Sequence, residues 1–339
     1  MSVPPRLPPR VASLSVLAFV FVLLPGLLSL TGSQYYFSLA QSALIFVILA
    51  ASLNLISGSA GLLSFAHAAF YGIGAYTAAL MATKLGTPFY VNILPGGIMA
   101  SLFGVLVALP IMRLTSIYFA VATLGIGQIF YIVMLNWYDV TNGAMGIRSI
   151  PLLGAFGYDW SGSLATYYVL AVVAVICVWA ISRFTHSYYG NAIRALREDP
   201  DCAQAMGINV VRLKVEVFAA SCFFAGVAGT LYAHTVSFIS PDSFGFTDSI
   251  LILACVVVGG LGSLPGAVVG AVLLVVAPEL TRGFGDFRIL VFGVLLYLSI
   301  MLMPRGLVGE VSALDLVRRQ FHRSWPEGDG RGARGVGWR

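Results

Sequence analysis

The chain has 339 residues, of which 59% are hydrophobic and only 10% are charged. A soluble domain has about a quarter of its residues charged, so this chain carries too little charge to cover a globular surface in water. The composition therefore excludes a soluble globular protein and predicts a polytopic α-helical membrane protein. The formal net charge of +5 does not indicate a nucleic-acid-binding surface, because the basic residues lie in loops and tails, where membrane orientation explains them.

A transmembrane helix needs about 20 apolar residues, and the chain contains a series of such blocks. Residues 1–10 are basic and rich in proline, and we assign them to a cytoplasmic N-terminal segment. The apolar run from 11 to about 30 is long for a signal peptide and no Ala-X-Ala site follows it, so we interpret it as a retained first helix. The later apolar blocks lie at 37–56, 62–83, 89–112, 116–135, 164–182, 215–235, 249–262, 264–281 and 288–304.

These blocks predict an all-α transmembrane helix bundle of about ten spans, with both termini in the cytoplasm. In that topology, 15 of the Lys and Arg residues lie on the cytoplasmic side and 4 lie outside. Nine spans would instead place the arginines of the C-terminal tail outside, against the positive-inside rule. The expected transmembrane domain covers 11–308, and a polar cytoplasmic tail at 309–339 is expected to be partly disordered.

The block at 52–79 has the sequence SLNLISGSAGLLSFAHAAFYGIGAYTAA and is rich in small residues. One interpretation is close helix packing, which small residues favour in membranes. The other is a helix broken at Ser57–Gly61, whose freed backbone groups line a pathway. For His67 the sequence favours a neutral side chain bonded to a backbone carbonyl over a pathway role. The candidate pathway or helix-break residues here are Gly58, Gly61, His67 and Gly72.

Gln128 lies inside the apolar block at 116–135, and the sequence TNGAMGI follows that block at 141–147. Gln128 joins the candidate pathway residues because it is polar within an apolar helix. The loop with Trp137 and Tyr138 is interpreted as an interfacial aromatic belt plus a turn, in preference to a docking surface for an external partner.

The only long polar segment between apolar blocks lies at 183–214, which we call the charged segment. Asp199 can serve as a helix N-cap, and Pro200 suits the first helical position, where a missing N–H has no cost. Gly207 is typical of the left-handed residue that ends a helix. The charged segment therefore predicts a short, capped helix held outside the bilayer.

The sequence GGLGSLPG at 259–266 divides a long apolar stretch and contains Gly259, Gly260 and Gly262. It predicts either a tight turn between two close-packed spans or an unwound segment at a gate, and the sequence does not separate the two. A re-entrant half within 249–281 is also left open.

Several chemistries are excluded by what the sequence lacks. The P-loop pattern Gly-x-x-x-x-Gly-Lys-Ser/Thr does not occur, and neither does a catalytic triad or a haem signature. The four cysteines have no metal-ligand spacing and are interpreted as small buried residues. We therefore expect no enzymatic activity, no cofactor and no metal. Acidic residues are absent from the centres of the spans, where ion-coupled carriers usually have them. Any transport by this chain is therefore expected to be driven by a partner protein rather than by coupled ions.

Six motifs occur in order: NLISGSAGLLSFAHAAFYGIGAYTAAL, YFAVATLGIGQI, TNGAMGI, GNAIRALREDPDCAQAMGI, VVVGGLGSLPGAVVGA and PRGL. Together, over about residues 40–308, they resemble the LivM-type permease subunit of the high-affinity branched-chain amino acid ABC importers. The resemblance implies a multi-pass protein of the bacterial inner membrane. It also implies three kinds of protein partner, in the bilayer and on its two sides: a second, LivH-type permease, two cytoplasmic ATPase subunits and an external substrate-binding protein.

In that family the charged segment corresponds to a cytoplasmic coupling loop that sits in a cleft of the ATPase. The coupling residues expected from the resemblance are Gly190, Arg194, Ala195, Asp199, Pro200, Ala205 and Gly207. Relatives of the same type carry urea, short amides or aromatic acids, so these substrates stay open as alternatives. An ion-coupled secondary carrier and a non-transporting membrane scaffold are the remaining alternatives.

Overall fold

The computed structural model describes residues 34–280 except 115, 156–157 and 160–162, together with 293, 294 and 297. Within these residues the chain forms a bundle of long helices, with one two-residue antiparallel ladder that pairs Gly154 with Asp159. The elements in order are α2 Gln34–Asn54, η1 Leu55–Ser59, α3 His67–Leu85, α4 Phe89–Ile111, α5 Ser116–Asn136, α6 Tyr138–Thr141, η2 Gly143–Met145, β1 Gly154–Ala155, β2 Tyr158–Asp159, α7 Ser163–Thr185, α8 Tyr188–Glu198, α9 Pro200–Ala205, α10 Val210–Val236, η3 Pro241–Phe244, α11 Phe246–Gly259 and α12 Leu264–Leu280.

The all-α prediction is confirmed for this part of the chain, and each apolar block between 37 and 281 contains one long helix. Among the described residues, five helical stretches are long and apolar enough to cross a membrane: Tyr35–Ser59, Phe89–Ile111, Ile117–Asn136, Leu164–Thr185 and Pro241–Gly259. The expected spans at 11–30 and 288–304, and the two terminal segments, lie outside the described residues, save for the three isolated positions. The total of about ten spans and the orientation of the termini therefore stay predictions.

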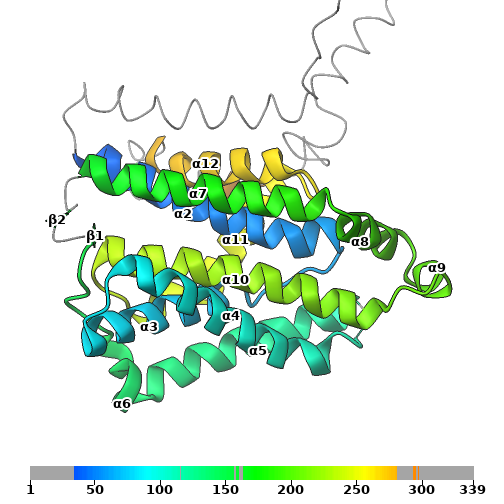
Figure 1. Cartoon of the computed structure of the whole chain (residues 1–339), viewed down its shortest axis with the longest axis horizontal. Coiled ribbons are helices and arrows are strands. Elements are labelled where there is room, and N and C mark those ends of the chain that lie inside the picture. Colours follow the sequence, from blue (N-terminus) through cyan, green and yellow to red (C-terminus); the bar gives the residue numbers. More distant parts are fainter. Residues whose placement is uncertain are drawn as a thin grey trace, which may run out of the picture.

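The long helices lie in two packed groups (Figure 1). In one group α2 packs against α7 and α12, and in the other α10 packs against α3 and α4. Contacts between α2 and α10 join the groups, while α11 packs on both α12 and α2. Helix α5 flanks the second group, and α8 and α9 extend beyond one end of the bundle.

Glycine allows the helices of the second group to approach at backbone distance. A side chain at Gly226 of α10 would overlap the backbone of α4 at Gly96 and Gly97, and one at Gly74 of α3 would overlap Gly226 itself. Small residues at helix interfaces are the usual means of close packing in membranes, where association depends on van der Waals contact. The packing interpretation of the glycine-rich block 52–79 is thus confirmed for its second half.

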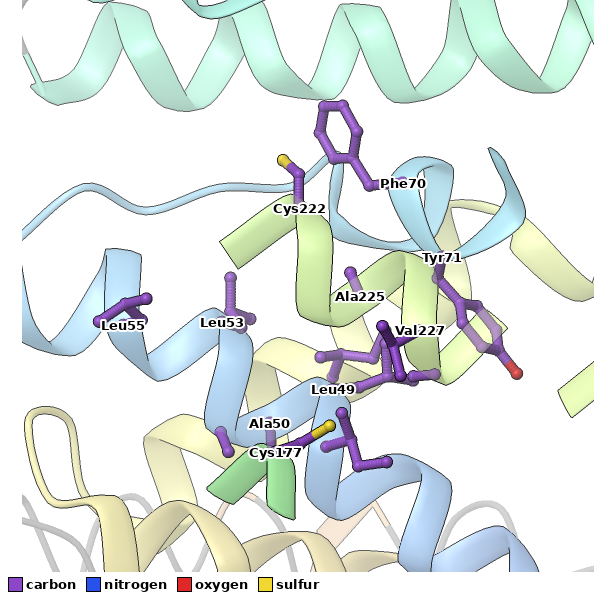
Figure 2. Packing of buried hydrophobic residues seen from close by; sticks show 14 of the residues in the cluster. Leu49, Ala50, Leu53, Leu55, Phe70, Tyr71, Cys177, Cys222, Ala225 and Val227 are labelled. Carbon is purple, nitrogen blue, oxygen red and sulfur yellow. The ribbon is translucent and has the colours of Figure 1, made fainter. Parts of the chain in front are cut away.

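The buried core connects the two groups through apolar side chains of moderate size. Leu49 and Leu53 of α2, Cys177 of α7 and Ala225 of α10 belong to one buried cluster, and all of them are at least 95% buried (Figure 2). Tyr167 and Phe218 are among the largest side chains that are fully buried. The prediction that every cysteine is buried is wrong for Cys202, which is exposed because it lies on α9, outside the bundle.

Candidate functional site: two helix breaks and a projecting segment

The first predicted helix break is present between α2 and α3. Helix α2 continues into the π-helical turn η1, and residues 60–66 then follow without regular secondary structure until α3 begins at His67. Side chains from other helices satisfy part of this backbone: Thr123 Oγ1 accepts a hydrogen bond from Phe65 N at 3.1 Å, and Ser249 Oγ accepts from Ala68 N at 3.1 Å. Irregular backbone at membrane depth is tolerated when it is buried in protein in this way.

His67 is completely buried at the start of α3, and its ring has two partners. Its Nε2 lies 2.8 Å from Ser52 Oγ, and the backbone carbonyl of Leu49 also hydrogen-bonds the ring. Ser52 Oγ donates to the same carbonyl at 2.8 Å. The predicted bond to a backbone carbonyl is therefore present, and a serine of α2 adds a partner that the sequence did not indicate.

Two further predicted pathway residues, Gly72 and Gln128, differ in burial. Gly72 is buried within α3, where an added Cβ would come within 2.8 Å of Phe130 and 2.9 Å of Phe244, so it serves packing. Gln128 is exposed on α5 and borders a cleft of about 10 Å³ with Phe65 and Ser249. That volume is close to the space that one water molecule needs, so the cleft does not accommodate an amino acid in this conformation.

The second predicted break, at 259–266, is a turn between two helices in close contact. Helix α11 ends at Gly259 and α12 begins at Leu264, and side chains at Gly259 or Gly266 would each overlap the backbone of the other. Gly260 and Gly262 have φ of 118° and 87°, a region that L side chains rarely adopt. Of the two interpretations left open, the geometry is that of a tight turn.

The loop after α5 is joined to the segment after α10 by an isolated antiparallel backbone bridge. Asn142 is left-handed, and Ile147 and Ile239 exchange backbone hydrogen bonds of 3.0 and 3.1 Å. Trp137 and Tyr138 are exposed at the end of α5. This arrangement fits the predicted aromatic belt plus turn.

The charged segment forms two helices, α8 and α9, where a single short helix was expected. The predicted capping of α9 is confirmed: Asp199 Oδ1 accepts from Asp201 N at 2.9 Å and from Cys202 N at 3.1 Å, and Pro200 occupies the first turn. Gly207 has φ of 84° and donates its N–H to Gln204 O at 2.9 Å. The sequence did not predict α8 as a separate helix because it lacks a side-chain cap at Ser187.

The surface of the α8–α9 segment is open to solvent in the described chain. Tyr188 and Met206 are 85% and 84% exposed, and Arg194, Ala195 and Ala205 are exposed as well. Gly190 is buried instead, and a side chain there would overlap the backbone of Thr185 at the end of α7. The predicted coupling residues are thus of two kinds: Gly190, Asp199, Pro200 and Gly207 shape the segment, whereas Arg194, Ala195 and Ala205 form its surface.

Hydrogen bonding also sets the charge at the start of α9. The backbone N–H of Cys202, then its thiol, then the N–H of Asp201 hold the pKa of Asp199 below its ordinary value. In return, the Asp199 carboxylate raises the pKa of the Cys202 thiol. At neutral pH the cap is therefore ionised and the exposed thiol is protonated.

Two residues that the sequence analysis did not single out as site residues connect these regions. Arg197 of α8 donates from Nη1 to Gly58 O at 2.7 Å, and Asn54, at the end of α2, accepts from Gly262 N at 2.9 Å. The charged segment and both glycine breaks therefore meet at one place. Since the partners are 139 and 208 positions apart in the chain, local sequence patterns carry no signal for either contact.

Comparison with known proteins gives a family for this arrangement. The family model described as branched-chain amino acid transport system / permease component matches residues 35–303. The LivM permease proteins of Salmonella typhimurium strain LT2 and Escherichia coli strain K12 are each 36% identical to the chain over 293 residues, which is 80% of this chain and 69% of the relative. LivH of Escherichia coli K12 is 27% identical over 78% of the chain and 91% of its own length. No solved structure matches the chain significantly. The chain is a multi-pass membrane protein that belongs to the branched-chain amino acid transport permease family.

Proposed function

We propose that the chain is the permease subunit of an ABC importer of the bacterial inner membrane, which moves branched-chain amino acids inward. The observation that carries this proposal is the α8–α9 segment, capped at Asp199 and exposing Tyr188 and Met206 beyond the end of an apolar bundle. A short rigid helix transmits a movement of a bound partner better than a flexible loop does. The chain contains no P-loop pattern, so ATP hydrolysis must take place on separate subunits.

The partners in this proposal follow from the family. A LivH-type permease pairs with the chain in the bilayer, two ATPase subunits bind the α8–α9 segment on the cytoplasmic side, and an external binding protein delivers the substrate. ATP-driven closure of the ATPases moves α9 and rocks the helix bundle from outward-open to inward-open. The relatives are branched-chain amino acid permeases, which supports branched-chain amino acids over urea, short amides or aromatic acids as the substrate.

Cys202 offers a direct test, because it is exposed on α9 while Cys177, Cys222 and Cys255 are buried. A thiol-directed photocrosslinker attached at Cys202 in inside-out vesicles of the assembled transporter is expected to capture a nucleotide-hydrolysing subunit. The Cys202→Ser chain is the control and should capture nothing. Capture of no ATPase, when right-side-out vesicles of the same preparation are active in uptake, would contradict the proposal.

Energy coupling and substrate are tested separately in right-side-out vesicles of the same assembled transporter, supplied with the external binding protein. Uptake of labelled leucine is expected to stop on ATP depletion and to persist with an ionophore, whereas an ion-coupled carrier shows the reverse. Unlabelled isoleucine and valine should compete for uptake, and urea and short amides should not. Competition by urea but not by valine would assign the chain to the alternative substrate class.

A further inference from the structure

Three segments that are distant in sequence meet at the end of α2. Arg197 Nη1 of α8 donates to Gly58 O at 2.7 Å, in a bond that is partly buried. Gly262 N, in the α11–α12 turn, donates to Asn54 Oδ1 at 2.9 Å. One turn of polypeptide, from Asn54 to Gly58, thus accepts a hydrogen bond from the charged segment and another from the second glycine break.

The charge of Arg197 suits this position for an electrostatic reason. The C-terminal end of a helix presents carbonyls without intrahelical donors and a partial negative charge, which a cation stabilises. Neither α2 nor η1 has a basic residue in its own last turn. Arg197 supplies that cation from another helix, through a charge-assisted bond of the stronger kind.

The glycines around Arg197 leave room for its side chain. A Cβ added at Gly61 would lie 3.2 Å from Arg197 Cγ, and one added at Gly262 would lie 3.0 Å from Nη1. A side chain at Gly58 would overlap Asn54 Oδ1 and Gly262 N. Glycines from both breaks, Gly61 and Gly262, therefore border the arginine side chain.

Arg197 lies on the side of α8 that faces the bundle. Gly190, Ile193 and Leu196 are the buried residues of α8, and Arg197 follows Gly190 by two helical turns, on the same face. Arg194 and Arg197 are both exposed as whole residues, but the Arg197 guanidinium bonds Gly58 O in a partly buried contact. The helix can therefore contact a partner with one face while Arg197 holds the helix breaks with the other.

We propose that Arg197 is the positioning residue that transmits movement of α8 to both glycine breaks. This inference rests on the proposed coupling of α8 and α9 to an ATPase. Movement of α8 carries the guanidinium, which moves Gly58 O directly, and it moves the α11–α12 turn through Asn54 and Gly262. The two breaks then shift together with α8 rather than independently.

The first test uses the assembled transporter in proteoliposomes, with uptake and ATP hydrolysis measured in the same preparation. In Arg197→Ala, uptake per ATP hydrolysed is expected to fall about tenfold, within the usual range of coupling between sites. Arg197→Lys should restore part of the ratio, because an ammonium retains the charge and one donor. Arg183→Ala, which removes an exposed arginine from the last turn of α7, is the matched control and should keep the ratio.

Two outcomes of this test would overturn the inference. One is an unchanged ratio in Arg197→Ala. The other is loss of ATPase subunits on co-purification of that variant, because the residue would then act in assembly rather than in transmission.

The second test does not depend on the energy source or on the substrate. Spin labels at Cys202 and at a cysteine replacing Leu63, which is 38% exposed beside the first break, report the distance between α9 and that break. Arg197→Ala is expected to broaden the distance distribution relative to the parent chain and to Arg183→Ala. An unchanged width would overturn the inference even if uptake proves to be ATP-driven, and a broadened width would support it even if uptake proves to be ion-driven.

Discussion

The α3–α4–α10 group and the α8–α9 segment both depend on glycine, but for different physical reasons. In the group, Gly74 and Gly226 remove side-chain volume so that helix backbones touch. In the segment, Gly207 has open space around it and is required for its φ of 84°. Substitution in the first region should therefore prevent folding, whereas substitution in the second should leave a folded protein that couples poorly.

The largest effect is expected for Gly226→Leu. The new side chain would overlap the α4 backbone, which cannot move away without separating the helices. We therefore expect the free energy of unfolding to fall by about 3 kcal/mol or more. The measurement is the thermal midpoint and the monodisperse fraction in detergent. Gly125→Leu on α5 is the control, because no described atom lies within 4 Å of its added Cβ. Equal stability of the two variants would remove the distinction between packing glycines and surface glycines.

The next effect is expected for Gly207→Val. A β-branched residue resists positive φ, at a strain of about 1–3 kcal/mol, so the end of α9 should unwind. Uptake should fail while ATP hydrolysis persists. Gly207→Asn is the matched control, since asparagine tolerates the left-handed region. Normal uptake by the valine variant would argue against a coupling role for the α8–α9 segment.

A smaller effect is expected for His67→Ala, which distinguishes a packing role for this residue, like that of the glycines in the α3–α4–α10 group, from a role in the substrate pathway. Removing the ring leaves a gap beside Ser52 and breaks the Nε2 to Ser52 Oγ contact, with a cost of about 1–3 kcal/mol. We expect a lower thermal midpoint and an unchanged ratio of leucine to valine uptake. A changed ratio at constant stability would instead place His67 in the substrate pathway.

The smallest effect is expected for Asp199→Asn, because asparagine caps a helix about as well as aspartate. Loss of the carboxylate should return the pKa of Cys202 toward its ordinary value, so the thiol should react a few-fold faster with a maleimide at neutral pH. Asp201→Asn, whose charge is the weakest of the causes, should change the rate less. Equal rates in both variants would contradict the assigned hydrogen bond.

The same substitution should also change how the stability of α9 depends on pH. Because the pKa of Asp199 is lowered in the folded chain, its cap stabilises α9 above the ordinary carboxyl pKa. That contribution is lost as the pH falls through the lowered value. The spin-label distance between α9 and the first helix break should therefore broaden on acidification in the parent chain, and should broaden less in Asp199→Asn.

Much of the fold could be predicted because its signals are local. Apolar blocks of sufficient length gave the helices between 34 and 280, and the Asp199–Pro200 pair with Gly207 gave the limits of α9. The glycines at 57–61 and 259–262 marked both breaks. Local signals failed at α8, which has no side-chain cap. At His67 they indicated the backbone carbonyl but not Ser52, the second partner, which lies on another helix.

The sequence by itself determined a helical membrane protein with two glycine breaks and one charged, capped segment, because composition and capping depend on neighbours in the chain. Only the tertiary structure decided that these features are one site, since Arg197 reaches Gly58 and Asn54 reaches Gly262 across 139 and 208 positions. Such contacts depend on how helices pack, and packing in a membrane is set by shape and small residues rather than by any local pattern.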